Sequence, residues 1–470
     1  MVFTSYSFLF LFLPAVLLVY YAVVRRRNIR LVVLLLASYL FYAWPDWRFL
    51  GLILFSTVLD LFCAGLMTEG ASPRRRKLLL LVSLAGNLGL LGWFKYRNFF
   101  VESLNGLLAP LGMDALSPIR PDILLPIGIS FYTFQSMSYT IDVYRGQAKP
   151  LPWRQAHGFL TYVALFPQLV AGPIVRFKEL ADQLFEREHS WDKITQGLFL
   201  FMLGFVKKTL LANDLAYFPR ALFGGQHAGF LDAWTGLTSY TLQIYFDFSG
   251  YSDMAIGLGL LFGFTFPINF NSPYKSESIT DFWRRWHISL SSWLRDYLYI
   301  PLGGNRGGAL KTARNLLLTM LLGGLWHGAA WTYVLWGAWH GLWLGFERWI
   351  GKRSPLFFLP RVTRRALTFL VVTLGWLLFE ARSLDQVRTL GQSLLAWNDG
   401  EPFLLGTPRD PSLGLYALIL GLLIAWFAPN SQTLAAKITP AKAILVFIAF
   451  VIGVGHMLQM GFNPFIYYRF

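Results

Sequence analysis

Long apolar stretches recur along the whole chain, separated by short polar or basic connections. A helix needs about 20 apolar residues to cross the hydrocarbon core of a membrane. The pattern predicts membrane helices in the apolar segments at residues 5–24, 31–44, 49–67, 78–94, 123–141, 157–175, 196–212, 234–264, 313–325, 329–346, 366–379, 413–428 and 442–460. We expect the short segments at 31–44 and 313–325 to be tilted, re-entrant or enclosed by other helices.

Composition supports a lipid environment. Of the 470 residues, 55% are hydrophobic and only 14% are charged, whereas soluble domains carry roughly a quarter of charged residues. The mean hydropathy is +0.48. These values exclude a water-soluble protein and predict an all-α polytopic membrane protein. We expect one domain, residues 1–470, with roughly 10 to 13 membrane helices plus interfacial helices.

The net charge of +16 comes from Lys and Arg clusters between apolar segments, for example at residues 25–30 and 74–77. Basic residues in the loops of membrane proteins mark the cytoplasmic side. This distribution argues against nucleic acid binding and predicts that the N-terminus lies outside the cytoplasm. The first apolar run lacks a preceding basic region and a following small-residue cleavage site, so we interpret it as a retained helix.

One connection is unusually polar. Residues 282–308 read FWRRWHISLSSWLRDYLYIPLGGNRGG, a mixture that cannot face lipid. It is typical of an amphipathic helix at the cytoplasmic interface, with arginines reaching water. We expect its aromatic side chains to form an interfacial belt, namely Trp283, Trp286, Trp293 and Tyr297.

The sharpest signal for chemistry is GGLWHGAAWTYVLWGAWHG at 323–341, which places His327 and His340 in apolar surroundings. An ionisable residue at membrane depth is costly unless it has a partner or a function. Either histidine could also make a packing hydrogen bond between helices. On one straight helix the two would point about 140° apart. Glycines around His327 leave room for a substrate or another backbone, so we favour His327 as functional and His340 as structural.

Other buried polar groups are candidates for supporting roles. His287 lies 40 residues before His327 and could reach the same place, or could be exposed at the interface. Asp60, Asp142, Asp247 and Asp253 also lie in apolar context. Such acids either orient a catalytic histidine or pair with a cation, here Arg176, Lys207 or Lys208, and we favour pairing for most of them.

Several chemistries are disfavoured. The single cysteine, Cys63, excludes an internal disulfide framework and a Cys-based metal site. The chain has no Gly-x-Ser-x-Gly elbow, phosphate loop, His-Glu-x-x-His pair or dinucleotide-binding glycine motif. We therefore expect no metal, and no covalent serine hydrolase, ATPase or metalloprotease.

Long motifs along the chain resemble the membrane-bound O-acyltransferase (MBOAT) family, in particular its bacterial alginate O-acetylation branch. They include PIGISFYTFQSMSYTIDVYRG at 126–146, FPQLVAGPIVRF at 166–177, VKKTLLANDLA at 206–216, DFWRRWHISLSSWLRDYLYIPLGGN at 281–305, GLWHGAAWTYVLWGAWHG at 324–341 and the closing NPFIYYRF. The resemblance implies a helical fold with a central tunnel. It also implies that His327 in the LWHG motif is catalytic, assisted by His287.

The resemblance further implies acetyl-CoA as a cytoplasmic donor substrate, with no permanently bound cofactor, and a periplasmic polysaccharide as acceptor. Because arginine pairs well with phosphate, we expect the donor to bind Lys275, Arg284, Arg285 and Arg295. In this branch the membrane subunit of the bacterial inner membrane hands the acetyl group to a separate periplasmic serine-esterase-like partner. D-alanyl or peptidoglycan-directed transfer and a polysaccharide or lipid transporter remain alternatives, and alginate, cellulose and peptidoglycan are all candidate acceptors.

Overall fold

The computed structural model describes residues 1–68, 70–113, 116–117, 125–225, 229–351, 358–397, 412–460 and 465–466. These residues form helices and turns and contain no strand. The start of the predicted segment 123–141 and most of the closing motif lie outside the described residues, as do residues 398–411. The described helices confirm the all-α fold.

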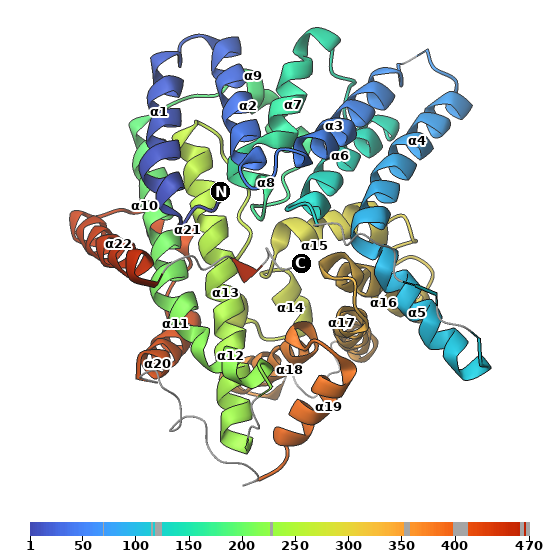
Figure 1. Ribbon diagram of the computed structural model, residues 1–470, viewed down its shortest axis with the longest axis vertical. Helices are drawn as coiled ribbons and strands as arrows, with labels where there is room; N and C mark the ends of the chain where they lie inside the picture. Colours follow the sequence, from blue (N-terminus) through green and yellow to red (C-terminus); the bar gives the residue numbers. More distant parts are fainter. Residues whose placement is uncertain are drawn as a thin grey trace. The chain divides into compact units, whose positions relative to one another are not determined.

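The chain divides into two compact units, and the prediction of a single membrane domain remains a prediction. The first unit contains Met1–Ile194 and Leu258–Phe266, and the second contains Thr195–Gly257 and Pro267–Phe470. Two helices have residues in both units, α10 (Trp191–Val206) and the long α13 (Phe230–Leu261), both of which can be followed in Figure 1.

The first unit contains most of the N-terminal helices. They are η1 (Ser7–Phe12), α1 (Leu13–Ala22), α2 (Arg27–Ala43), α3 (Phe49–Gly65), α4 (Pro73–Leu91), η2 (Gly92–Tyr96), α5 (Arg97–Leu108), η3 (Ala109–Leu111), α6 (Ile129–Tyr144), η4 (Trp153–Gln155), α7 (Ala156–Ala164), α8 (Phe166–Leu169) and α9 (Phe177–Phe185). α2 packs against α1 and α7, and α6 packs against α3 and α4.

The second unit contains the remaining helices. They are η5 (Lys207–Ala212), α11 (Asn213–Leu215), α12 (Tyr217–Phe223), η6 (Pro273–Lys275), α14 (Ile279–Trp283), α15 (Ile288–Leu294), η7 (Arg295–Tyr299), α16 (Ala309–His327), α17 (Trp331–Ile350), α18 (Arg361–Glu380), α19 (Leu384–Ser393), α20 (Ser412–Phe427), α21 (Ser431–Ala435) and α22 (Pro440–Met460). α16 and α17 form its most extensive helix pair, and α18 packs on α17.

Within the described residues, four helical stretches are long and apolar enough to cross a membrane by themselves: Pro73–Leu111, Trp191–Leu215, Arg361–Glu380 and Pro440–Gln459. Three shorter apolar helices accompany them, at Ser7–Ala22, Phe49–Gly65 and Ser412–Phe427. The protein is therefore a membrane protein. The expected total of 10 to 13 membrane helices remains a prediction, because length and composition alone do not identify helices that other helices enclose.

The predicted segment 157–175 is not one helix. α7 ends at Ala164, and Leu165 leaves the helical conformation with a ψ of 107° before the short α8 begins. Pro167 lies in the first turn of α8, where a proline is tolerated; inside one continuous helix it would lack the N–H that bonds to Val163 and its ring would clash with that carbonyl. The backbone N–H of Phe166 donates to the Ser38 hydroxyl at 3.0 Å, which satisfies a donor that the break frees.

Glycines bring α10 and α13 into backbone contact in the second unit. A Cβ added at Gly250 would lie 2.7 Å from the carbonyl oxygen of Gly204, and one added at Gly257 would lie 2.5 Å from that of Gly197. The contacting glycines are seven residues apart on each helix, so they lie on one face. Close approach through small residues is the usual way that helices associate within a membrane.

The polar connection differs from the expected interfacial helix. It forms two short helices, α14 and α15, followed by η7. Trp286, Trp293 and Tyr297 are buried rather than forming an exposed belt, so that prediction was wrong. Arg284 and Arg295 are exposed as expected. The sequence pattern predicted exposed aromatic residues, but they pack inside the protein. Trp286, for example, contacts Phe270, Phe282 and Trp376.

Candidate active site

His327 is the last residue of α16 and is only 3% exposed. Three aromatic rings meet its imidazole edge-on or nearly so, those of Trp326, Trp336 and Phe379, with centroids 4.9, 5.1 and 5.2 Å away. They come from α16, α17 and α18 respectively. The imidazole therefore lies in an aromatic cage in the second unit.

The glycines around His327 allow this cage to form. A Cβ on Gly324 would collide with the carbonyl oxygen of Tyr333, so α16 and α17 approach in backbone contact there. A Cβ on Gly328 would collide with the Tyr333 ring. We expected these glycines to leave room for a substrate or another backbone, and in the described structure α17 occupies that room.

His287 lies in the connection between α13 and α16 and is fully buried. Its φ of 43° is in the left-handed region, which is uncommon for a residue other than glycine. Strained residues of this kind persist where the surrounding structure holds them and cluster at functional sites. Asn269 provides that support: its carbonyl accepts from Ile288 N–H at 2.9 Å, and its side chain meets His287 Nδ1 at 3.1 Å.

The hydrogen bonds of Asn269 set the tautomer of His287. Asn269 Oδ1 accepts from the backbone N–H and the hydroxyl of Ser289, at 3.3 and 2.9 Å, while Nδ2 donates to Ser252 at 3.0 Å. Because Oδ1 is an acceptor, His287 Nδ1 carries the proton, and Nε2 is the basic nitrogen. His287 lies outside the apolar spans, and burial lowers its pKa to about 3, so the ring is neutral near pH 7.

Trp326 joins the two histidines. Its ring centroid lies 4.9 Å from that of His327 and 6.3 Å from that of His287. Phe248 of α13 packs edge-on against the other side of His287 at 4.7 Å. The structure thus brings His287 and His327 into one buried neighbourhood, whereas the sequence could not distinguish this from an interfacial position for His287.

His340 occupies a different setting. α16 ends at His327 and α17 begins at Trp331, so the two histidines do not share a helix and the angular argument from the sequence was wrong. His340 Nδ1 accepts a hydrogen bond from Trp283 Nε1 at 3.3 Å. The Trp336 ring lies 5.1 Å from both His327 and His340. This hydrogen bond fixes α14 to α17, which fits the structural role predicted for His340.

Two buried acids of α13, Asp247 and Asp253, pair with lysines. Asp247 forms an ion pair with Lys208, and both side chains are almost fully buried. Asp253 pairs with Lys207 at 2.6 Å and also accepts from Ser431 at 2.6 Å. These contacts confirm the predicted pairing with Lys207 and Lys208 for two of the four acids.

Two acids of the first unit have other partners. Asp142 pairs with Lys178 at 3.4 Å, a lysine that we had not singled out. Asp60 accepts hydrogen bonds from Ser83 and from Asn87, whose amide nitrogen lies 3.0 Å from both carboxylate oxygens. Asp60 therefore joins α3 to α4.

The four predicted phosphate ligands do not form one cluster of uncommitted cations. Arg295 pairs with the adjacent Asp296 at 2.6 Å. Arg285 pairs with Asp281 at 2.9 Å, and Lys275 donates to the carbonyl oxygen of Ala428 at 2.6 Å. Arg284 is exposed.

Lys275 and Arg285 are nevertheless part of a concentration of positive charge. Burial, and then the charges of Arg365 and Arg285, lower the pKa of Lys275. We call Lys275, Arg285 and Arg365 the cationic cluster. Beside it, Glu277 binds Arg364 at 2.7 Å and lies 3.8 Å from Arg361 and from Arg365.

Sequence reasoning missed Asn269 and the arginines of α18. The run RVTRR at 361–365 directly before an apolar segment was a usable signal, because basic residues gather at the ends of membrane helices. Asn269 had no comparable signal, because it lies in an irregular connection without periodicity.

Comparisons with known proteins agree with this architecture. Residues 154–381 match the model of the membrane-bound O-acyltransferase family. The chain is 45% identical to a Pseudomonas putida protein named probable alginate O-acetylase AlgI, with 100% of each chain covered. It is 38% identical to a Helicobacter pylori peptidoglycan O-acetyltransferase, covering 85% of this chain and 80% of that one. It is 30% identical to a Bacillus subtilis teichoic acid D-alanyltransferase, covering 54% of this chain and 69% of that one.

His287 and His327 both lie within the matched region. The similarity to the Pseudomonas putida protein covers both chains in full, and these three relatives carry the names of acyl transfer enzymes. The chain belongs to the membrane-bound O-acyltransferase family and is an O-acyltransferase.

Proposed function

We propose that this enzyme moves acetyl groups from acetyl-CoA on the cytoplasmic side across the bacterial inner membrane for O-acetylation of an extracellular polysaccharide, alginate in the first instance. Relatives named probable alginate O-acetylase are 45% and 51% identical over 100% and 85% of this chain. The observation that carries the proposal is the pair of buried histidines around Trp326, because acyl transfer to a hydroxyl needs a base shielded from water.

In the proposed reaction, a neutral imidazole of His327 removes the proton of the acceptor hydroxyl as its oxygen attacks the thioester carbonyl. The carbon–sulfur bond then breaks, and the thiolate takes up the proton. His287, whose Nε2 carries a lone pair, can accept a hydrogen bond and so orient this base. Polarising the carbonyl would need a donor at Nε2, which this tautomer does not have. In a second form of the mechanism, His327 accepts the acetyl group itself and passes it on. Both forms need an unprotonated imidazole.

Acetyl-CoA in the cytoplasm cannot diffuse through the lipid to an acceptor on the other side of the membrane, because coenzyme A carries several negative phosphates. A cationic site for these phosphates on the cytoplasmic face is therefore required. The cationic cluster is our candidate, with exposed Arg284 next to it in sequence. We assign Arg295 a smaller part, because it is not one of the residues of this cluster and pairs with its neighbour Asp296.

The length of α18 supports this assignment. Arg365 of the cationic cluster and Phe379, which packs on His327 at 5.2 Å, are fourteen residues apart on one continuous helix. At 1.5 Å per residue they are separated by about 21 Å. An extended pantetheine arm can bridge such a distance, so phosphates at the cluster would place the thioester near His327.

A charge-matched pair of variants tests the donor site. Arg365→Gln should raise the KM for acetyl-CoA severalfold and leave kcat nearly unchanged, because it removes a charge that binds ground state and transition state equally. Arg382→Gln removes the same charge from an exposed site just beyond the other end of α18, and we expect no effect. Equal KM values for both variants would contradict this donor site.

Polymer acetylation in a deletion strain tests the catalytic assignment. A strain complemented with His327→Ala should produce unacetylated polymer, although the protein is present in the membrane at its normal level. His340→Ala is the matched control, since it removes a histidine that is equally buried, and it should retain acetylation if it folds. Acetylated polymer from the His327→Ala strain would remove this residue from the mechanism.

We further propose that the N-terminus lies on the periplasmic side and that a separate serine-esterase-like protein receives the acetyl group there. The basic connections at 25–30 and 74–77 support the orientation. Co-purification of the partner with the full-length enzyme, and loss of polymer acetylation when the partner is deleted, test the transfer step.

Peptidoglycan is the second candidate acceptor, favoured by the 38% identical Helicobacter relative. D-alanyl transfer has weaker support, because the relative with that activity in its name matches only 54% of this chain. Mass analysis of surface glycans and peptidoglycan from a deletion strain separates these acceptors. A polysaccharide or lipid transporter without transferase activity is disfavoured by the family membership.

A further inference from the structure

Acyl transfer from a thioester needs a second group besides the base. When a hydroxyl oxygen attacks the carbonyl carbon, the carbonyl oxygen becomes negatively charged, and enzymes stabilise this charge with preorganised hydrogen-bond donors. His287 cannot supply such a donor, because its Nδ1 proton is directed at Asn269 and its Nε2 carries the lone pair. The reaction proposed for His327 therefore needs a donor from another residue.

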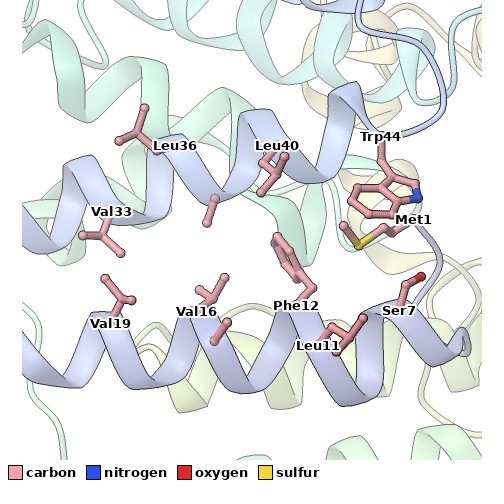
Figure 2. Close-up of a pocket in the computed structure, with 12 residues that line it drawn as sticks. Met1, Ser7, Leu11, Phe12, Val16, Val19, Val33, Leu36, Leu40 and Trp44 are labelled. Carbon is pink, nitrogen blue, oxygen red and sulfur yellow. The ribbon is translucent and has the colours of Figure 1, made fainter.

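The apolar groove of the first unit does not offer such a site. It runs between η1–α1 and α2, and Figure 2 shows apolar side chains such as Phe12, Val16, Leu36 and Leu40 along its walls. No histidine and no acid is among the residues that line it, so it contains no side chain that could act as the base. The base and a donor lie in the second unit instead.

Trp336 of α17 has a buried donor beside His327. Its side chain is 1% exposed, and its ring lies nearly perpendicular to the imidazole of His327, with centroids 5.1 Å apart. Within the part of the chain that the structure describes, the Trp336 Nε1–H has no hydrogen-bond partner. A buried N–H without an acceptor costs free energy, and native proteins rarely leave one in this state. This N–H is therefore free to bind a substrate atom.

The other aromatic rings near His327 differ from Trp336. Phe379 packs on the same imidazole but has no polar atom. Trp326 contacts both His327 and His287, so it is the competing source of an indole donor. Trp339, on the same helix as Trp336, uses its Nε1–H for a structural bond, donating to the carbonyl oxygen of Val371 at 3.0 Å.

The distance between Trp336 and His327 fits the geometry of acyl transfer. A general base lies about 2.6–3.2 Å from the attacking oxygen, and an oxyanion donor lies about 2.7–3.1 Å from the carbonyl oxygen. Both oxygens are bonded to the same carbon, so base and donor are roughly 5 to 8 Å apart. Two rings with centroids 5.1 Å apart can place one nitrogen of each at such a separation.

We propose that Trp336 is a catalytic residue whose indole N–H donates a hydrogen bond to the thioester carbonyl oxygen as that oxygen becomes negative. His327 takes the hydroxyl proton while the new carbon–oxygen bond forms, and the π electrons of the carbonyl move to its oxygen. The carbonyl then re-forms, the carbon–sulfur bond breaks, and the thiolate receives the proton from His327. The indole keeps its own proton throughout. This assignment rests on the catalytic role proposed for His327.

Two variants of the full-length enzyme test the donor. Benzothienylalanine incorporated at position 336 replaces only the N–H by sulfur and keeps the shape of the ring, whereas Trp336→Phe removes the N–H with part of the ring. Loss of one oxyanion donor should lower kcat about 10²- to 10³-fold. The KM for acetyl-CoA and the thermal stability of the benzothienylalanine variant should stay close to wild type, because the bond forms only in the transition state.

Benzothienylalanine at position 339 is the matched control. It removes an indole N–H from the same helix, and this N–H has a structural partner in Val371, so we expect nearly the wild-type kcat. A near wild-type kcat with benzothienylalanine at position 336 would overturn the proposal. A loss of kcat that parallels a loss of stability, or a larger loss with benzothienylalanine at position 326, would also overturn it.

His327→Ala, measured beside these variants, separates this proposal from the proposed function. An inactive His327→Ala together with an active benzothienylalanine variant at position 336 contradicts only the role of Trp336. Substantial transfer by His327→Ala contradicts the proposed reaction itself, and with it the oxyanion role of Trp336.

Discussion

The buried pair of Lys208 and Asp247 should contribute strongly to the stability of the second unit. Their side chains are 3% and 1% exposed, and Asp247 also accepts from the backbone N–H of Ile466 at 2.8 Å. The next residue on α13, Phe248, packs on His287. The pair therefore fixes η5 to the part of α13 that supports the candidate active site.

Lys208→Met leaves a carboxylate buried without its cation. Breaking a buried pair in this way costs about 3–5 kcal/mol, which lowers the midpoint of thermal unfolding by about 5 to 10 °C for a cooperative unit of this size. The double variant Lys208→Met with Asp247→Leu removes both charges and should recover part of this loss, because an apolar pair carries no desolvation penalty, whereas the N–H of Ile466 loses its acceptor. The exposed pair of Arg27 and Glu186, at 68% and 75% exposure, is the control, and Arg27→Gln should cost less than about 1 kcal/mol.

The assay is thermal unfolding of the detergent-solubilised enzyme, followed by the fraction that remains monodisperse after heating. Four proteins form a double-mutant cycle: wild type, each single variant and the double variant. A coupling free energy near zero, or a Lys208→Met midpoint as close to wild type as that of Arg27→Gln, would refute the reasoning.

Three further predictions follow from individual contacts. Asn269→Ala removes the acceptor that sets the tautomer of His287, and should lower kcat roughly tenfold or more with little change in KM; steady-state kinetics at normal protein level check this. Gly324→Ala pushes a methyl group into the backbone of α17 and should cost about 1–3 kcal/mol, whereas Gly455→Ala, with open space around it, should be neutral in the same thermal assay. Glu347→Gln weakens the carboxylate that accepts from the first two N–H groups of α14 at 2.6 and 2.8 Å, and should lower both stability and activity, whereas a wild-type midpoint would contradict this role.

The positions of many helices were predictable from the apolar segments of the sequence. The segment 234–264 corresponds to α13, and the two segments 313–325 and 329–346 correspond to the end of α16 and to α17. The break inside 157–175 was not predicted, although Pro167 signals it, because a proline does not fit a helix interior. The burial of Trp286 and Trp293 was missed because an amphipathic pattern rich in tryptophan looks the same at a lipid interface and inside a protein.

The candidate site was predictable in its residues but not in its geometry. The LWHG motif indicated His327, and the same family resemblance indicated His287. Their common contact with Trp326 depends on chain reversals at the ends of α14 and α16, which no local pattern encodes. The left-handed backbone of His287 and its support by Asn269 are likewise tertiary features, since the preference of an isolated histidine opposes that conformation.

We propose that His287 and His327 act together as one buried catalytic unit. The most direct test of this proposal is the rate of acetyl transfer from labelled acetyl-CoA to polymer in membrane vesicles that contain His327→Ala, His287→Ala or both substitutions. We expect each single variant to lose most of the activity and the double variant to be little worse than His327→Ala, because residues that act as a unit are strongly non-additive. Losses that multiply in the double variant, or substantial transfer by His327→Ala, would contradict the central claim.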